Sequence, residues 1–350
     1  MALEGKKRKL SLQMLRTEQT SVTHLGGMEL RQPIRNLGSV DERLDGIFSP
    51  GYSDNEVGLH IHDVFLEKVD DYLAFCPVNR GLIDHWKELI RTAIGSDIGS
   101  EGLNIVDIGS GQGTSVFPMA ELTPGSNVMA TDLSIPLLLQ IRKFASGAGY
   151  RNLTVLQMNA ENMVFSDAQA DIVMGGHVLH HALSLAGIFA EIRRVLKPRG
   201  VAVFWEPFED GGQLIAGIFD LWIEMDRYQT ERLAPEVIAA MHSFTADLQR
   251  RVGRIKPPGL LETLDDKWWF STQHIQDLAH AAGFPSCDIR NVYEPGNVVR
   301  SMTDHELRRW GFGLDSMPSW AQEKLLAVQS RFSEDYLRGH PFSASIVMRP

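Results

Sequence analysis

Three histidines and one glutamate are the side chains of this sequence best suited to proton transfer. His177, His180 and His181 lie within five residues, and Glu206 ends a later apolar run. An imidazole titrates near neutral pH, and a buried carboxylate on one of its nitrogens fixes the tautomer and stabilises the charged ring. We predict that His180 is a general base supported by Glu206 and that His181 lies in the substrate pocket. A capping or salt-bridge carboxylate, and a histidine without a role, are the alternatives.

The same histidines could instead bind a metal ion, but the sequence argues against this. Adjacent residues such as His180 and His181 point in divergent directions on a regular element, and no Asp or Glu stands near them in the sequence. Cys76 and Cys287 are far apart and indicate neither a disulfide framework nor a zinc site. We therefore expect no metal, and the cysteine usage fits a reducing cytoplasm.

A second stretch, residues 103–113, has the pattern of a ligand-binding turn. An apolar run containing Asp107 leads into Gly109, Gly111 and Gly113. Glycine lets the backbone turn tightly and approach a ligand where a Cβ would clash, and cofactors bind at such turns in open parallel sheets. A dinucleotide site needs Gly-x-Gly-x-x-Gly, but Thr114 stands at the third glycine position. The spacing therefore argues against a nicotinamide cofactor.

Asp132 ends the next apolar run, nineteen residues after Gly113. An acidic side chain at this place can accept hydrogen bonds from the hydroxyl groups of a ribose. The alternative is an N-cap for the helix that begins near Pro136, although Ser134 could cap that helix equally well. We predict ribose binding.

The elements that must position these residues form an alternating pattern. Helical patterns lie near 114–122, 135–148, 161–165 and 183–196, between strand-like runs at 103–107, 127–132, 153–158, 170–174 and 201–206. Such alternation predicts right-handed βαβ units and a parallel sheet covered on both faces. A helix at 272–282 and strands at 287–293 and 343–348 complete the pattern.

The chain has 350 residues, which exceeds one average domain and predicts a core with insertions. We expect a mobile segment at 1–40, a helical cap at 41–99 with helices at 57–75 and 78–94, and a core at 100–210. A helical lid at 211–270 and the rest of the core at 271–350 follow, the latter with a helical insertion at 303–338. The lid would exclude water from the bound substrate. Trp222, Trp268 and Trp269 are candidates for its pocket wall, and packing on the sheet is the alternative.

Composition excludes some classes of partner. The net charge of −10 argues against nucleic-acid binding, which needs a basic face. No apolar run approaches the ~20 residues of a membrane helix, and no signal peptide is recognisable, so we expect a cytoplasmic protein without a membrane span. Apolar and aromatic content in the insertions favours a small-molecule acceptor, and the protein could form a homodimer.

The ordered motifs resemble those of class I S-adenosylmethionine-dependent methyltransferases. They are Val-Asp-Ile-Gly-Ser-Gly-Gln-Gly, Thr-Asp-Leu-Ser, Asn-Ala-Glu-Asn, Asp-Ile-Val-Met and Leu-Lys-Pro-Arg-Gly. The Val-Leu-His-His stretch is similar to that of ubiquinone and menaquinone C-methylating enzymes. His180 and Glu206 also resemble the His–Glu dyad of polyketide C-methyltransferase domains.

This resemblance implies an α/β fold with a Rossmann-like, seven-stranded, mostly parallel sheet, helices on both faces and helical cap or lid insertions. It also implies S-adenosylmethionine as cofactor, bound by residues at the ends of the strands: Asp107, Gly109, Ser110, Gly111, Gly113, Asp132, Leu133, Asn159, Ala160 and His177. The family usually has Asp where this chain has Asn159, so the contact to adenine is weaker here or passes to Glu161.

The expected function is methylation of a small, apolar or aromatic acceptor at carbon or oxygen, of a quinone-like or secondary-metabolite kind. Two alternatives differ in class. A nicotinamide-dependent oxidoreductase would share the sheet and Asp132 but needs a glycine at Thr114. A catalytically silent binding protein on the same fold would keep the sheet but lose the glycines or Asp132.

Overall fold

A single mixed sheet organises the protein. The computed structural model describes residues 21–61, 65–70, 73, 78–95, 98, 101–292 and 297–350. Within them the strands are β1 (Val22–Leu25), β2 (Met28–Asn36), β3 (Ile47–Ser49), β4 (Asn104–Ile108), β5 (Asn127–Asp132), β6 (Leu153–Gln157), β7 (Ala170–Gly176), β8 (Leu196–Pro207), β9 (Ser286–Asn291) and β10 (Ser343–Arg349). Their order across the sheet is β1-β2-β3-β6-β5-β4-β7-β8-β10-β9.

The seven strands from β6 to β9 in that order are the sheet that the sequence predicts. Strands β6, β5, β4, β7 and β8 run parallel, whereas β10 pairs antiparallel with both β8 and β9. The carboxyl ends of the parallel strands therefore share one edge, where ligands bind in open α/β sheets. The predicted Rossmann-like fold class is confirmed.

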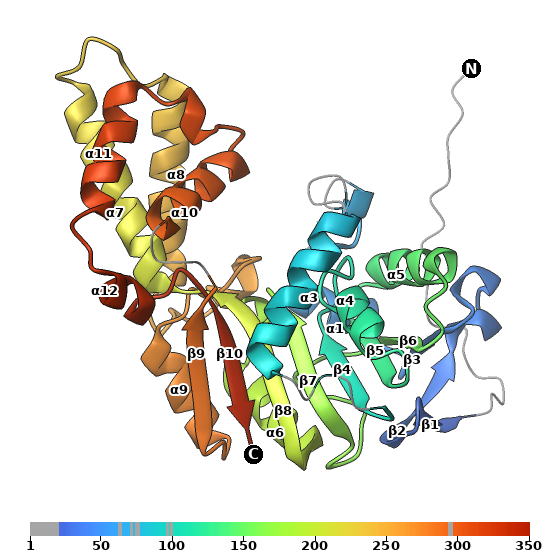
Figure 1. The fold of residues 1–350 in the computed structure, drawn as a ribbon. Helices are drawn as coiled ribbons and strands as arrows, with labels where there is room; N and C mark the ends of the chain where they lie inside the picture. Colours follow the sequence, from blue (N-terminus) through green and yellow to red (C-terminus); the bar gives the residue numbers. More distant parts are fainter. Residues whose placement is uncertain are drawn as a thin grey trace, which may run out of the picture.

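Helices cover both faces of this sheet (Figure 1). The described helices are α1 (Asp54–His60), α3 (Arg80–Ile94), α4 (Val116–Leu122), α5 (Ile135–Ala148), α6 (Leu185–Val195), α7 (Glu209–Asp226), α8 (Pro235–Arg251), α9 (Thr272–Ala281), α10 (Val298–Arg309), α11 (Ser319–Gln329) and α12 (Glu334–Gly339). Side chains of α3, α4 and α5 form the core on one face, with Ile105 of β4. Side chains of α6 and α9 form the core on the other, with Val106 and Ile108. The alternation along β4 follows the period of two that a strand buried on both faces requires.

The N-terminal region differs from the expectation of a mobile segment. Residues 22–36 form β1 and β2, β3 follows, and β3 extends the sheet by parallel pairing with β6. Alternate residues of β2, namely Met28, Leu30 and Ile34, are buried on the sheet. Gln32 at an inward position and the following Pro33 interrupt this short period-two pattern in the sequence. Residues 1–20 lie outside the described part.

Two predicted helices also differ from expectation. The capping box of Ser53 and Glu56 starts α1 early, and this helix already ends at Ile61, so the 57–75 pattern is not one helix. Several residues of that range, and Cys76, lie outside the described part. Residues 161–165 form a turn instead of a short helix. Helix α3 confirms the prediction for 78–94.

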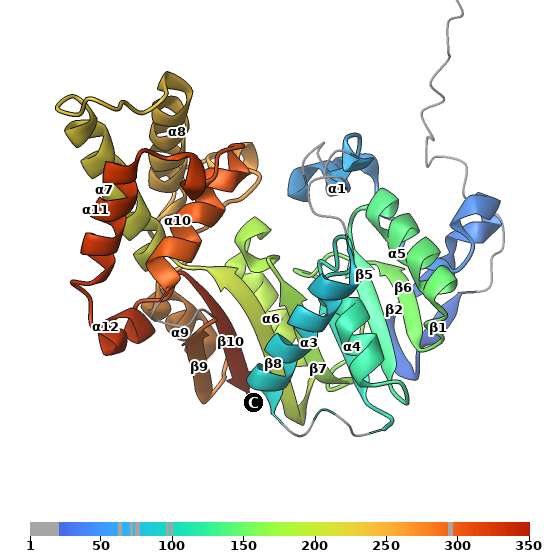
Figure 2. The ribbon, with the colours of Figure 1, turned by 45° about the horizontal axis from the view of Figure 1, so that its top comes forward.

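The two predicted insertions combine into one helical body. Helices α7, α8, α10 and α11 share a third core, which includes Phe219, Met241, Met302 and Leu325. Figure 2 shows this body standing beyond the carboxyl end of β8, apart from α1 and α3. No helix within the described ranges combines the length and apolar character that a membrane crossing requires.

Candidate functional site

A cavity of about 710 Å³ opens at the carboxyl edge of the parallel strands. The expected cofactor-binding residues that line it are Gly109, Ser110, Gly111, Asp132, Leu133, Asn159, Ala160 and His177. Further lining comes from the turn after β4, the chain between α1 and α3, α3 itself and the loop after β7. The glycine turn and the ends of β5, β6 and β7 therefore meet at one place, as the sequence predicts.

The glycine turn has the backbone geometry that its residue types suggest. Gly109 has φ +59°, and a Cβ there would lie 2.2 Å from Val178 Cγ2. Gly113 has φ +98°, and a Cβ there would lie 2.1 Å from the ring of Phe117. L-residues rarely adopt such φ values, so both positions require glycine. Gly113 faces Phe117 and does not line the cavity, so its place among the cofactor contacts is not supported.

Asp107 lies beneath the turn and also does not line the cavity. Its side chain is fully buried; Oδ1 accepts from the Ser115 hydroxyl at 2.8 Å, and Oδ2 has no hydrogen-bond partner among the described residues. Burial raises the pKa of this carboxyl to about 7, against the hydrogen bonds of Ser110 and Ser115. Asp107 therefore supports the turn from within.

Asp132 lies at the cavity and holds the glycine turn. Its Oδ2 accepts from the Gly111 backbone N–H at 2.9 Å, and Oδ1 accepts from the Ser134 N–H at 2.9 Å. Ser134, not Asp132, is the N-cap of α5, since its side chain accepts from the Leu137 N–H. A carboxylate has about four acceptor positions, so Asp132 retains capacity for ribose hydroxyls.

Asn159 is held by neighbours that the sequence did not reveal. Its Oδ1 accepts from the Glu161 N–H, and its Nδ2 lies 3.2 Å from Nε2 of His60. The Glu161 carboxylate accepts from the N–H groups of Leu183 and Ser184. Glu161 therefore holds the loop after β7 through Oε1, and because it also lines the cavity, both Asn159 and Glu161 are candidates for the contact to adenine.

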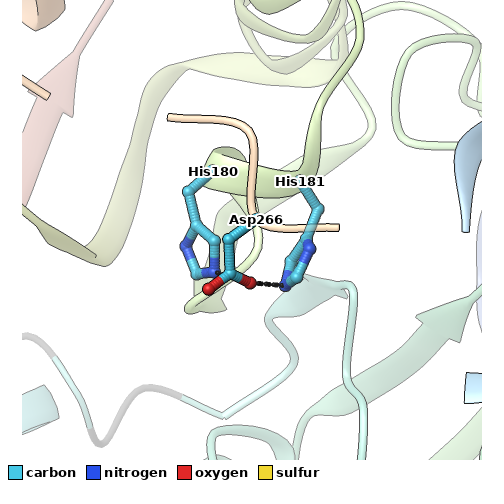
Figure 3. A group of neighbouring side chains, drawn as sticks. All are labelled: His180, His181 and Asp266. Atoms are coloured by element: carbon cyan, nitrogen blue, oxygen red, sulfur yellow. Dashed lines mark ion pairs between the residues drawn. The ribbon is translucent and has the colours of Figure 1, made fainter. Parts of the chain in front are cut away.

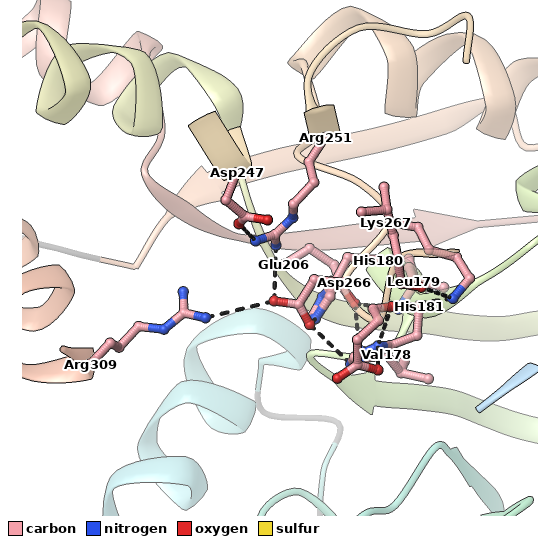
Figure 4. Close-up of polar contacts among 12 residues, drawn as sticks. Val178, Leu179, His180, His181, Glu206, Asp247, Arg251, Asp266, Lys267 and Arg309 are labelled. Atoms are coloured by element: carbon pink, nitrogen blue, oxygen red, sulfur yellow. Dashed lines mark hydrogen bonds and ion pairs between the residues drawn. The ribbon is translucent and has the colours of Figure 1, made fainter. Parts of the chain in front are cut away.

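His180 and Glu206 form a buried pair, and neither residue lines the cavity. Nδ1 of His180 lies 2.7 Å from Oε2 of Glu206. The other oxygen, Oε1, accepts from the backbone N–H groups of Val178 and Leu179 at 2.9 and 2.7 Å. Glu206 is fully buried and His180 is 5% exposed. The carboxylate is therefore fixed by the 3-10 turn η5 (Leu179–His181) that carries the histidine (Figure 4).

Charge sets the protonation of this pair. Burial alone would lower the pKa of His180, but the carboxylates of Glu206 and Asp266 outweigh it and raise the pKa to about 9. Burial alone would raise the pKa of Glu206, but the charge and hydrogen bond of His180 lower it. Opposite charges in a site with little water favour the ionised form of both partners.

Asp266 is a member of this cluster that the sequence analysis missed. Its Oδ1 lies 3.5 Å from Nε2 of His180 and 3.7 Å from Nε2 of His181 (Figure 3). The neighbouring Lys267 donates its backbone N–H to the His180 carbonyl at 2.7 Å. This hydrogen bond holds the chain that carries Asp266 against η5. The expectation that no acidic residue reaches the histidines is therefore wrong. The 85-residue separation explains the omission, although Asp265-Asp266 before Trp268-Trp269 was a visible signal.

The two other histidines line the cavity. Burial lowers the pKa of His177 to about 4 and, with the charge of His180, that of His181 to about 3. His177 has φ +57° and donates its N–H to the Trp205 carbonyl at 2.9 Å. Both rings are therefore neutral wall residues beside the charged His180.

The three tryptophans expected in the substrate pocket do not line the cavity. Trp222 and Trp269 belong to the core of the helical body, and Trp268 packs under the sheet and donates to the Ala182 carbonyl at 2.8 Å. The 211–270 insertion contributes no lining residue, and His305 of α10 is the helical body's contribution. Trp268 packs against the sheet, as the alternative expects, whereas Trp222 and Trp269 pack in the helical body, where the stripes cover one another. The apolar wall comes instead from Ile61, Phe65, Leu82, Trp86 and Leu89.

Comparisons with known proteins agree with this geometry. Residues 106–204 match the family described as "Methyltransferase domain". The chain is 27% identical to a demethylmenaquinone methyltransferase of Symbiobacterium thermophilum, over 69% of this chain and 92% of the relative. It is 31% identical to a demethylmenaquinone methyltransferase of Chlorobaculum tepidum, over 36% of this chain and 50% of the relative. It is 28% identical to an aklanonic acid methyltransferase of a Streptomyces species, over 38% and 56%. The chain thus spans about half the length of the last two.

The cavity fits the cofactor that these matches imply, S-adenosylmethionine. Two buried polar atoms of lining residues, Oε1 of Gln112 and Nε1 of Trp205, have no hydrogen-bond partner in the part of the chain that the structure describes. Buried polar groups are normally paired, so these atoms are available to a polar ligand in the cavity. The glycine cradle and Asp132 provide the rest of the fit. The matches set aside the nicotinamide and the silent-protein alternatives.

Proposed function

We propose that this chain, a class I S-adenosylmethionine-dependent methyltransferase of the small-molecule type, methylates carbon or oxygen of a small apolar or aromatic acceptor, with His180 and Glu206 removing the acceptor proton. The observation that carries the proposal is the buried 2.7 Å contact between His180 Nδ1 and Glu206 Oε2. Glu206 accepts backbone N–H groups on its other oxygen, so its position does not depend on the histidine. A carboxylate fixed in this way keeps a proton on Nδ1, so once the charged ring has released its Nε2 proton, Nε2 can accept one from the acceptor.

The donor side of the cavity supports the cofactor half of the proposal. The turn of Gly109 to Gly111 would approach the cofactor closely, and Asp132 would accept its ribose hydroxyls. Asn159 and Leu133 border the place for the adenine ring. When bound, the cofactor supplies an activated methyl group on a sulfonium. The protein's own contribution is alignment, which can supply up to ~7–11 kcal/mol.

The apolar part of the lining supports the acceptor half. Phe65, Leu82, Trp86 and Leu89 belong to it. Among the described residues, the lining includes only two carboxylates, Asp132 and Glu161. Apolar walls with a few placed polar groups are typical of small-molecule sites. The relatives named for demethylmenaquinone and aklanonic acid agree with an acceptor of this size. An acidic hydroxyl or C–H group must reach Nε2 of His180 where Asp266 now lies. A cytoplasmic location and a homodimer stay predictions.

Labelled methyl transfer tests this proposal. The purified chain and S-adenosylmethionine with a labelled methyl group are offered a panel of quinols, phenols and β-keto acids. With the best acceptor, His180→Ala should lower kcat by ~10²–10⁴-fold and leave cofactor affinity nearly unchanged. Asp132→Ala should instead weaken cofactor binding, measured by calorimetry, and have the smaller effect on kcat. His242→Ala, on the exposed face of α8, is the matched control. Unchanged turnover in the His180 variant would refute the base role.

A further inference from the structure

We propose that His180, His181 and Asp266 form a binding site for a divalent transition-metal ion such as Zn²⁺. One ligand atom from each residue lies within 4.8 Å of the others (Figure 3). The carboxylate oxygen Oδ1 is 3.5 and 3.7 Å from the two Nε2 atoms. Tetrahedral zinc with bonds of ~2.0–2.2 Å needs ligand atoms roughly 3.3–3.6 Å apart. The two carboxylate–imidazole distances are therefore close to those of a zinc site, and the two rings must reach the same spacing from a separation within 4.8 Å.

Both imidazoles are already oriented as metal ligands. Nδ1 of His180 faces Glu206 at 2.7 Å, and Nδ1 of His181 lies 3.1 Å from the Asp265 carbonyl. Each Nδ1 therefore donates its hydrogen to a fixed oxygen. Nε2 of the neutral His181 ring has a free electron pair, and Nε2 of the charged His180 ring gains one when the metal displaces its proton. Metal-bound histidines almost always hold the second nitrogen in this way, so the outer shell of the site is complete.

The carboxylate ligand is held equally firmly. Arg251 lies 3.0 Å and Arg309 3.7 Å from Oδ2 of Asp266, and Arg251 also pairs with Asp247 at 2.6 Å (Figure 4). The arginines thus occupy Oδ2 and leave Oδ1 for the histidines. Their positive charge opposes a cation, whereas Glu206, Asp265 and Asp266 attract one. Two nitrogens and one oxygen favour zinc, cobalt or nickel over magnesium or calcium, which prefer oxygen ligands.

The ion has an entry path and an open position. The side chain of His181 is 24% exposed, that of Asp266 is 26% exposed, and His181 lines the cavity. A three-ligand site keeps its fourth position for water or a bound molecule. Nε2 of His180 is also the atom that the proposed base uses, so metal and base function exclude one another. This consequence, inhibition by the metal, rests on the proposed function, but the site itself does not.

Metal titration of the full-length chain tests the site. After treatment with a chelator and desalting, the protein is titrated with Zn²⁺ by calorimetry and with Co²⁺ by visible absorption. We expect one ion per chain and the intense absorption of tetrahedral Co²⁺. His181→Ala and Asp266→Asn should each weaken Zn²⁺ binding at least about tenfold to hundredfold. The matched control, His242→Ala, should bind like the unmodified protein. The proposal would be overturned if the unmodified protein did not bind Zn²⁺, or if the two site variants bound it as tightly as the unmodified protein.

An activity arm separates the two proposals. Zn²⁺ should inhibit methyl transfer by the unmodified chain and by His242→Ala, and a chelator should restore it. If Zn²⁺ fails to bind while His180→Ala is inactive, the metal site is wrong and the base role stands. If Zn²⁺ binds and His180→Ala keeps its turnover, the base role is wrong and the metal site stands. Stimulation of the unmodified chain by Zn²⁺ would refute the exclusion of base function by the metal.

Discussion

Two fully buried carboxylates, Asp107 on β4 and Glu206 on β8, have opposite electrostatic surroundings. Asp107 has one oxygen without a partner, and burial raises its pKa to about 7. Burial would also raise the pKa of Glu206, but His180 and two backbone N–H groups lower it. Beneath the glycine turn, burial therefore disfavours the ionised form of Asp107. Beside His180, the hydrogen-bonding partners of Glu206 keep it ionised. Burial alone does not decide the role of a carboxylate; its partners do.

The largest expected effect comes from removing the charge of Glu206. In Glu206→Gln the amide oxygen can still accept from Val178 and Leu179, but the NH₂ group then faces Nδ1 of His180. The ring must take the other tautomer, with its proton on Nε2, and cannot act as a base. We expect kcat to fall by ~10²–10⁴-fold with little change in cofactor affinity.

A double variant sharpens this result. Because the two residues act as a unit, His180→Ala combined with Glu206→Gln should cost about as much in kcat as either change alone. Steady-state kinetics of the four proteins measures this. Multiplicative losses would show that Glu206 acts independently of the histidine.

The second effect tests Asp107 through the pH dependence of stability. Its pKa is raised from 3.8 to about 7 by folding, so its contribution to the free energy of unfolding is full below pH 4 and is lost as the pH rises to 7. The loss is at most about 4 kcal/mol. Asp107→Asn should lack this loss, whereas Asp220→Asn, exposed on α7, should keep it. Urea unfolding between pH 4 and 8 measures the slope, and parallel curves for Asp107→Asn and the unmodified chain would contradict the assignment.

The smallest effect concerns which aromatic residues contact the acceptor. Trp222 is buried in the helical body, whereas Phe65 lines the cavity and contacts His181 edge-on. Trp222→Phe should lower the free energy of unfolding by about 1–2 kcal/mol and leave the acceptor KM unchanged. Phe65→Ala should raise that KM several-fold with a smaller effect on stability. If only the Trp222 variant changed the acceptor KM, Trp222 would belong to the pocket wall after all.

The donor end could be predicted from the sequence because it is built from short contiguous motifs. Gly109, Gly111 and Asp132 belong to strand ends whose positions follow from strand alternation. The pairing of His180 with Glu206 was predictable for the same reason, since β7 and β8 are neighbours. Asp266, Arg251 and Arg309 come from the insertions. Their helical periodicity does not predict which of their residues reach His180, and only tertiary contacts bring these three there. The strands at 22–36 were missed because polar residues interrupt their alternation.

The separate core of the helical body has a consequence for how this protein opens. Its apolar side chains contact mostly one another, so α7, α8, α10 and α11 form a candidate unit for sub-global unfolding. Arg251 and Arg309 belong to this unit, whereas His180 and Glu206 belong to the sheet. In native-state hydrogen exchange we therefore expect amides of α8 and α10 to exchange together, ahead of those in β4 and β7. Each such opening would release Asp266 from both arginines at once, so local unfolding of a distant body would change the charge surrounding His180.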